Sequence, residues 1–511
     1  MRRVPILSGS RIVQVPLEDD DLILAPPPPP TQVVDVAAAV RDAVRFPLDG
    51  PPLADVVPRA GRVTVVVEPP ALPMPGAQFD PRPLALATVL GELSGLGVTD
   101  DRQTILVAGG LARKLPRRDL ERLLPPPQAR DFRGRVLVHD AADPALRELD
   151  LGEGRRGAIN AAIVEAALVV VVSSAETVLQ GGPAALVSAC DAETIRGSAT
   201  ADSLLQAAGS RAWQLALGVE RAVTAHGPLH GVSLVLDHPR LAGRFRGYPH
   251  DERSFDHVAR SPLRRLYSLL PASLRRGLLR DLQRTIAATD AFAGTPSVAH
   301  AEALLRTVEL RGVPLGEPLD VLVVGSPWIG PHVPRELLNP ITSAAMSLGI
   351  VLRTWLDAFP VTDGGTLVLV HALTRSFAHG TQGPYRRLFD ALASGSDVGD
   401  SERGSGGDAR ALEAYRAGRA CHPLLPYADW AGCQPALERL GAVVVAESRD
   451  AVAARALGFV PSHSVASALE MAHGLAGAQA RVGVLPAPPY APLLGRASPL
   501  RGTSFEPARS S

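Results

Sequence analysis

Amine chemistry is restricted to one position in this sequence, because its 511 residues include a single lysine, Lys114. A lysine side chain forms Schiff bases and acts as a nucleophile once it is deprotonated. Arginine, which supplies nearly all of the positive charge here, does neither. Any mechanism that needs a lysine elsewhere in the chain is therefore excluded.

Among the histidines, His379 has the local sequence best suited to chemistry. It precedes Gly380 in a loop that follows a predicted strand, and α/β proteins place functional residues in such loops. A histidine there can transfer a proton or bind a carboxylate; its alternative role is to cap the next helix. His332, with Trp328 nearby, follows another predicted strand, but a rigid turn braced by prolines is the simpler interpretation.

The sequence shows no pattern typical of a metal site. His226 and His230 are four residues apart, but Gly227 and Pro228 lie between them, so the two histidines do not share a helix face. The cysteines have no zinc-like spacing, and their odd number argues against a disulfide framework. They are Cys190, Cys421 and Cys433. We therefore expect reduced thiols and no metal ligands.

The elements that position these residues alternate between strands and helices. Short β-branched runs are almost continuously apolar, which is typical of parallel strands covered on both faces. The predicted strands are residues 63–67, 104–107, 135–139, 168–173, 232–237, 319–324, 366–370, 442–446 and 481–485. Helical patterns lie between them, for example at residues 84–96, 158–167 and 465–475. This alternation predicts an α/β protein with largely parallel sheets.

Composition limits the choice of partners and compartment. The chain is 46% hydrophobic and 20% charged, as expected of a globular protein long enough for two or three domains. Its 52 basic and 52 acidic residues cancel, which gives no reason to expect nucleic acid or an anionic membrane as the main partner. The longest apolar stretch, residues 166–172, is too short to cross a bilayer. These features favour a cytoplasmic protein without a transmembrane segment.

Residues 240–290 interrupt the alternation of strands and helices. Arginines are interspersed with leucines there, which suits a helix that binds a membrane surface or a protein partner. Pro262, Pro271 and Gly277 interrupt any long amphipathic face, however, and this favours a solvated helical insertion. The arginines include Arg260, Arg264, Arg265, Arg275, Arg276, Arg280 and Arg284.

Three other segments have loop-like compositions. Residues 1–60 are rich in proline and include a run from Pro26 to Pro30, which we expect to be extended and outside any core. Residues 394–408 are rich in serine and glycine, which predicts a flexible loop. Residues 488–511 form a C-terminal tail.

The order of these elements resembles the nickel-pincer lactate racemase family. The strand and Gly-Gly turn at residues 105–110 are similar to those before the family's His-Arg motif. Residues 232–237 resemble the strand before the crossover to the second domain, and Phe292-Ala293-Gly294 with Ala299-His300 resembles a later family segment. Further matches in family order are residues 366–370 with His379-Gly380, Trp430 with Gln434, residues 458–461 and residues 482–486.

This resemblance extends from about residue 62 to residue 486. It implies an N-terminal α/β domain at residues 61–239, the insertion at 240–290 and a C-terminal α/β domain at 291–487. In this family the active site lies in a cleft between two such domains. The family's members are isomerases that racemise a 2-hydroxy acid with a nickel ion. A pincer attached covalently to a lysine holds that ion, and histidines act as nickel ligand, acid and base.

This sequence departs from the family pattern where that chemistry lies. The family's Asp-x-x-Arg motif corresponds to residues 69–72, which are Pro-Pro-Ala-Leu, and its His-Arg motif corresponds to Ala112-Arg113. The anchoring lysine and a neighbouring histidine correspond to positions in residues 176–188, which contain neither. Lys114 follows a different strand. We therefore do not expect the family cofactor to be attached covalently, and the cofactor is unknown.

Arg113, His379 and Trp430 are the residues that the sequence leaves as candidates to line the cleft. One hypothesis is a 2-hydroxy acid racemase or epimerase with an altered, degenerate active site. The alternative is a noncatalytic relative that binds a hydroxy acid, another small carboxylate or a protein partner. A third hypothesis is an interaction protein that works through residues 240–290.

Overall fold

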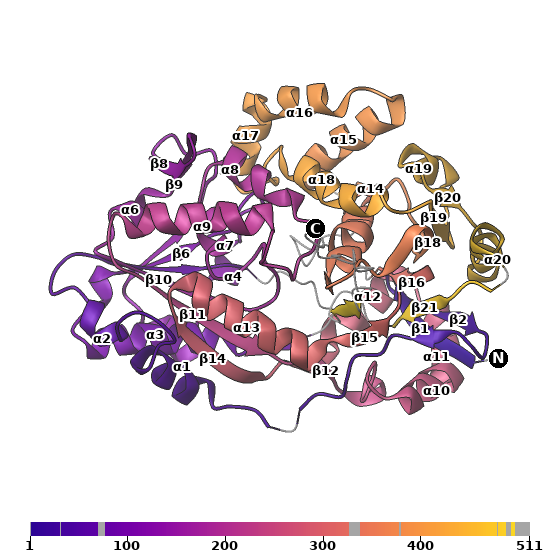
Figure 1. The fold of residues 1–511 in the computed structure, drawn as a ribbon, viewed down its shortest axis with the longest axis horizontal. Helices are drawn as coiled ribbons and strands as arrows, with labels where there is room; N and C mark the ends of the chain where they lie inside the picture. The colour runs from indigo at the N-terminus through magenta and orange to yellow at the C-terminus, as the bar shows by residue number, and fades with distance from the viewer. Residues whose placement is uncertain are drawn as a thin grey trace, which may run out of the picture.

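In the computed structural model, the chain forms two α/β domains, each built on a six-stranded sheet (Figure 1). The structure describes residues 2–30, 32–69, 77–326, 338–377, 380–477, 479–486 and 492–495. The N-terminal domain lies on the left of Figure 1 and the C-terminal domain on the right. The predicted α/β class and the largely parallel sheets are confirmed.

The N-terminal sheet has the strand order β14-β11-β10-β4-β6-β7. All neighbouring strands are parallel except β14, which pairs antiparallel with β11. The strands are β4 (Val63–Val67), β6 (Gln103–Val107), β7 (Arg135–Val138), β10 (Leu168–Ser174), β11 (Leu229–Leu236) and β14 (Ala288–Gly294). The carboxyl ends of the five parallel strands therefore meet at one edge of the sheet.

Burial on both faces explains why these strands have almost continuously apolar sequences. Val63 and Val65 of β4 belong to a core that also contains α1 (Val36–Arg45), whereas Val66 faces a second core that includes α9 (Arg211–Thr224). Because successive side chains of a strand point to opposite faces, a sheet covered by helices on both sides needs apolar residues at every position.

The C-terminal sheet has the order β20-β19-β18-β16-β21-β3, and every pair in it is parallel. Its strands are β16 (Leu319–Gly325), β18 (Val361–Val370), β19 (Ala442–Ala446), β20 (Val460–Pro461), β21 (Val482–Leu485) and β3 (Leu22–Ile23). One face packs on helices that include α18 (Leu425–Leu437). The other packs on α20 (Val465–Ala476) and on a hairpin from the start of the chain.

Residues 1–60 are not a segment separate from the two domains, which corrects the expectation from their proline content. The hairpin of β1 (Arg2–Ser8) and β2 (Arg11–Leu17) covers the C-terminal sheet, β3 extends that sheet, and α1 packs in the N-terminal domain. Alternating buried residues in both hairpin strands produce this packing. Residues 26–30 have neither helix nor strand, in agreement with the predicted extended run.

Residues 394–408 are mostly helical, so the predicted flexible loop is wrong. After α15 (Gly383–Ser394), a second helix, α16 (Val398–Gly406), begins where the Asp397 carboxylate accepts a hydrogen bond from the backbone N–H of Asp400. Capping by aspartate stabilises a helix start whose serine and glycine content is otherwise unfavourable.

The predicted helix at residues 158–167 is wrong in its first part. Residues 155–159 form β9 (Arg155–Ile159), and only a short helix, α6 (Ala161–Val164), follows. The predicted helices at residues 84–96 and 465–475 are confirmed as α3 (Arg82–Gly95) and α20.

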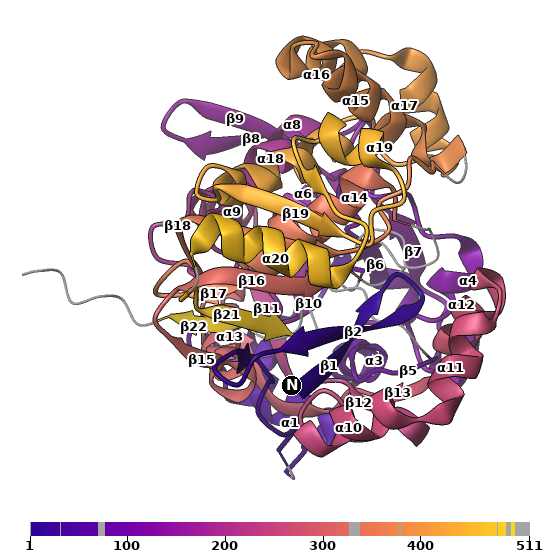
Figure 2. The same ribbon diagram turned by 90° about the vertical axis from the view of Figure 1, so that its right-hand side faces the viewer.

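The insertion and the C-terminal tail complete the description. Within residues 240–290 the chain forms α10 (Glu252–Arg260), α11 (Pro262–Leu269) and α12 (Ala272–Asp281), which lie beside the β1–β2 hairpin (Figure 2). Of residues 488–511, the structure describes 492–495, where β22 (Leu493–Gly495) pairs with two strands of the C-terminal domain.

No described helix is long and apolar enough to cross a membrane.

Polar contacts join the two domains near α17 (Ala409–Arg416). The Tyr415 hydroxyl donates to the backbone oxygen of Gly110 and accepts from the backbone N–H of Ala141, each at 3.1 Å. Lys114 forms an ion pair with Asp140 at 2.8 Å and donates to the backbone oxygen of Arg416 at 3.1 Å. The single lysine of the chain is thus engaged at a contact between the domains.

We predict that Tyr415→Phe lowers the free energy of unfolding by about 1–3 kcal/mol, because the buried Ala141 N–H loses its acceptor. Tyr427→Phe is the matched control, since its hydroxyl meets two serine hydroxyls within the C-terminal domain and these can reorient. Urea unfolding of both variants measures the difference. Equal stabilities for the two variants would contradict a role for Tyr415 in joining the domains.

Candidate functional site

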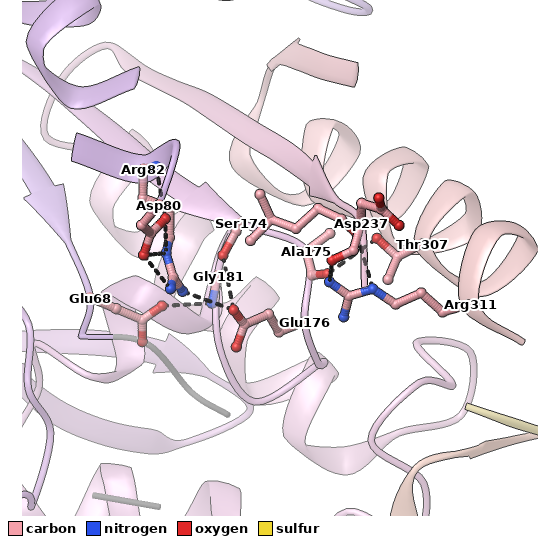
Figure 3. Close-up of polar contacts among 11 residues, drawn as sticks. Glu68, Asp80, Arg82, Ser174, Ala175, Glu176, Gly181, Asp237, Thr307 and Arg311 are labelled. Atoms are coloured by element: carbon pink, nitrogen blue, oxygen red, sulfur yellow. Dashed lines mark hydrogen bonds and ion pairs between the residues drawn. The ribbon is translucent and has the colours of Figure 1, made fainter. Parts of the chain in front are cut away.

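Three acidic side chains follow three neighbouring parallel strands of the N-terminal sheet. Glu68 follows β4, Glu176 lies two residues after β10, and Asp237 follows β11. These residues lie at the same edge of the sheet (Figure 3). Parallel α/β sheets bind their ligands outside the carboxyl ends of the strands, so this row of carboxylates marks the candidate site.

Arg82, the first residue of α3, holds two carboxylates of this cluster. Its guanidinium group donates to Asp80 at 2.6 Å and to Glu176 at 2.8 Å, and the three side chains are only 7–16% exposed. Burial lowers the pKa of Arg82, but the charges of Asp80 and Glu176 outweigh this effect and raise it. Removing charges from water is unfavourable unless they are paired, so the arginine and the carboxylates stabilise one another.

Glu68 is the titratable group of the cluster. Its carboxylate accepts from the backbone N–H of Gly181 at 2.6 Å and from the Ser188 hydroxyl at 2.7 Å. Burial raises the pKa of Glu68 to about 7, the two hydrogen bonds oppose that rise, and the nearby charge of Glu176 adds to it. A carboxyl group that titrates near neutrality can both give and take a proton at physiological pH.

The loop of residues 175–182, between β10 and α7 (Ala184–Val187), packs tightly against His300. Gly181 and Gly182 have φ values of +85° and +51°, and a Cβ atom on either glycine would lie within 2.4 Å of the His300 side chain. Only glycine combines this backbone conformation with such a close approach. The glycine pair singled out from the sequence is therefore a turn that the packing of His300 requires.

His300 fixes the loop through both ring nitrogens. Its Nε2 lies 3.0 Å from the backbone oxygen of Thr177, and its Nδ1 lies 3.1 Å from the Ser233 hydroxyl. Burial lowers the pKa of His300 to about 4, so the ring is neutral at physiological pH. It acts here as a buried hydrogen-bonding group that positions the 175–182 loop.

The residues predicted from the sequence are distributed between the two domains. Arg113 is half-buried in the loop after β6 of the N-terminal domain. Trp430 is on α18 and packs against the core of the C-terminal domain. His379 lies outside the described residues, as do His332 and Trp328. That Arg113, His379 and Trp430 line one cleft therefore stays a prediction.

Sequence reasoning missed the cluster of Glu68, Asp80, Arg82 and Glu176. The position of Glu68 and Glu176 in the sequence was a usable signal, because each lies within two residues of the end of an apolar strand. The pairing of Arg82 with Glu176 gave no such signal, because 94 residues separate them in the chain.

The chain is thus a two-domain α/β protein with buried carboxylates at the carboxyl ends of its N-terminal strands. Residues 8–182 match the family model described as the lactate racemase N-terminal domain. The fold resembles that of the lactate racemase apoprotein from Thermoanaerobacterium thermosaccharolyticum. The TM-score is 0.63 at 15% sequence identity, over 97% of this chain and 100% of that one. Residues 8–182 are thus similar to the lactate racemase N-terminal domain, and the whole chain has a lactate racemase-like fold, as its sequence indicated.

Two further comparisons complete this result. A protein from Thermotoga maritima aligns with a TM-score of 0.49 and 12% identity, over 94% of this chain and 100% of that one. No curated protein matches the chain.

The residues present do not fit the pincer cofactor that the family resemblance implies. Residues 176–188, where the anchoring lysine is expected, contain a buried glutamate paired with Arg82, a glycine turn packed on His300, and the fully apolar helix α7. Lys114 is paired with Asp140 after a different strand. Among the described residues, no group of three or more His, Cys, Asp or Glu side chains is arranged to hold a metal ion.

The raised pKa of Glu68 makes a prediction for stability as a function of pH. The folded state binds a proton at Glu68 more tightly than the unfolded state does. Stability therefore falls as the pH rises from 4.5, the ordinary value, to about 7, the value in the fold. Glu68→Gln removes this penalty, so the variant should exceed the wild type by on the order of 1–3 kcal/mol at about pH 8.

This advantage should shrink as the pH falls toward 4.5, where Glu68 is protonated in both states. Urea unfolding across this pH range measures it, with Glu153→Gln, 84% exposed, as the control that shows no such trend. A Glu68→Gln curve that runs parallel to the wild-type curve would contradict the assignment of a raised pKa.

Proposed function

We propose that this protein is a noncatalytic relative of lactate racemase that acts as a binding protein. The observation that carries this proposal is the state of residues 176–188. Glu176 and the N–H groups of Gly181 and Gly182 are all bonded inside the protein, to Arg82, Glu68 and Ser173 respectively. These bonded groups have a structural role, although the buried Oε1 of Gln180 has no hydrogen-bond partner, and the segment contains no lysine that could anchor a cofactor.

The charge of the cluster supports the same conclusion. A hydroxy acid carries a carboxylate and needs a positive group that is not already neutralised. Arg82 is shared between Asp80 and Glu176, and Glu68 adds a third carboxyl group beside them. The carboxyl edge of the N-terminal sheet therefore repels the family's class of substrate.

If this protein binds a small carboxylate, we propose that Arg113, His379 and Trp430 line the binding site in a cleft between the domains. A cytoplasmic location is part of this proposal. The three cysteines are buried and none forms a disulfide, which suits a reducing compartment.

This proposal predicts that the protein, purified from a host that makes the pincer cofactor, contains no stoichiometric nickel and has the unmodified mass. Elemental analysis and intact mass spectrometry test this, and a lactate racemase expressed in the same host is the positive control. The protein should also leave the enantiomers of lactate unchanged. An adduct on Lys114, or nickel at one equivalent, would overturn the proposal.

Glu68 favours a second candidate function, acid–base isomerisation of a 2-hydroxy acid without the pincer. A carboxyl group with a pKa of about 7 can take the proton from the α-carbon and, after the planar intermediate has turned over in the site, return it to the other face. This isomerisation only moves a proton off the α-carbon and back, so it needs no oxidant or reductant.

The second candidate predicts that α-protons of its substrate exchange with deuterium in D2O, which NMR detects across a panel of 2-hydroxy acids. Glu68→Gln should reduce the rate by about 100-fold or more, because the base is lost. Glu153→Gln, far more exposed, should leave it unchanged. Absence of exchange in the whole panel would reject this candidate and leave the noncatalytic one.

A further inference from the structure

The two helices α11 and α12 of the insertion expose leucines on their outer side. These leucines recur every three to five positions: Leu263, Leu266 and Leu269 on α11, and Leu274 and Leu278 on α12. Their exposed fractions range from 37% to 81%. Large apolar side chains that gather on a surface, rather than being scattered singly, mark an interaction site. We call this surface the leucine face.

The opposite side of the same helices holds them to the protein. The Tyr267 hydroxyl donates to the backbone oxygen of Ser10 at 2.9 Å, Nε of Arg275 donates to the Ser10 hydroxyl at 3.4 Å, and Leu279 is buried. Ser10 lies in the turn of the β1–β2 hairpin. The helices are therefore fixed with polar anchors inward and leucines outward, the reverse of an ordinary surface helix.

The charge of these two helices is mainly positive. Residues 261–280 contain five arginines and no acidic residue, and Asp281, the last residue of α12, pairs with Arg280. The arginines are Arg264, Arg265, Arg275, Arg276 and Arg280. A short helix with leucines on one face and arginines beside them has the composition of a helix that lies in the interface of an anionic bilayer.

We propose that the leucine face docks this protein on an anionic phospholipid surface, with the leucines among the acyl chains and Arg264 and Arg276 at the phosphates. Guanidinium groups bind phosphate in a bidentate way, and each cation near an anionic leaflet adds to the attraction. Pro262 and Pro271 divide the segment into two short helices but leave leucines exposed on both. The protein would lie on the membrane surface, since no described helix can span it.

A lipid surface suits this face better than an acidic protein does. The leucines are exposed on two short helices, which lie at the periphery of the molecule in Figure 2. A polypeptide is normally recognised in a groove or along a free strand edge, and the described residues of α11 and α12 form neither. This inference does not depend on whether the site at Glu68 is catalytic.

Vesicle cosedimentation of the full-length protein tests the proposal. The protein should sediment with vesicles that contain phosphatidylserine and remain in solution with phosphatidylcholine alone, and rising salt should weaken the binding. The double substitution Leu266→Glu and Leu269→Glu should lower the bound fraction by about tenfold or more, because charged residues do not enter the acyl region.

The matched control carries Leu305→Glu and Leu475→Glu, two leucines that are 58% and 62% exposed on other helices. It should bind as the wild type does, and circular dichroism verifies that both variants fold. The proposal fails if the protein ignores phosphatidylserine vesicles or binds both vesicle types equally. It also fails if the two double variants bind alike, or if a soluble acidic protein displaces the vesicles.

Discussion

The pairing of Arg82 with Asp80 and Glu176 is the interaction on which the candidate site depends. It joins the start of α3 to the loop after β10, two segments that are far apart in the chain but meet at the carboxyl edge of the sheet. A buried arginine needs its carboxylates as much as they need it, because an unpaired charge in that place costs several kcal/mol. The edge of the sheet is therefore organised around an internal ion pair, and this leaves its strongest cation unavailable to a ligand.

The same loop is fixed from its other side by packing. His300 fills the space next to Gly181 and Gly182 and uses both ring nitrogens within the protein, while Glu68 accepts from the N–H of Gly181. Two independent constraints, one ionic and one steric, thus hold residues 175–182. A loop held in this way loses the freedom to accommodate a bulky cofactor, which explains how a lactate racemase-like fold persists without the residues that would anchor one.

How far the sequence predicted this structure depends on the kind of signal involved. Strands such as residues 63–67 and 442–446 were located to the residue, because burial on both faces forces a continuous apolar run that few other structures produce. The helix α16 was missed because a single capping residue, Asp397, outweighs the serine and glycine that follow it. Composition is a poor guide where one side chain decides the local structure.

The site was harder to predict than the fold for a physical reason. An ion pair between Arg82 and Glu176 exists only after β4, β10 and α3 have been assembled, and nothing in the local sequence of either residue specifies the other. The family resemblance drew attention to residues 176–188, but only because they contain neither the family's lysine nor its histidine. The contacts of Glu176 with Arg82 and of Gly181 with Glu68 became visible only in the folded structure.

The distribution of charge along the chain differs from what its zero net charge indicates. Equal numbers of acidic and basic residues were taken as a reason to expect no anionic membrane. Charges act over a Debye length of about 8 Å at physiological salt, however, so a surface responds to its local charge and not to the sum over the chain. Carboxylates collect at Glu68, Asp80 and Glu176, whereas residues 261–280 carry only arginines. A buried cluster of carboxylates and an arginine-rich pair of helices can therefore coexist in a chain of zero net charge.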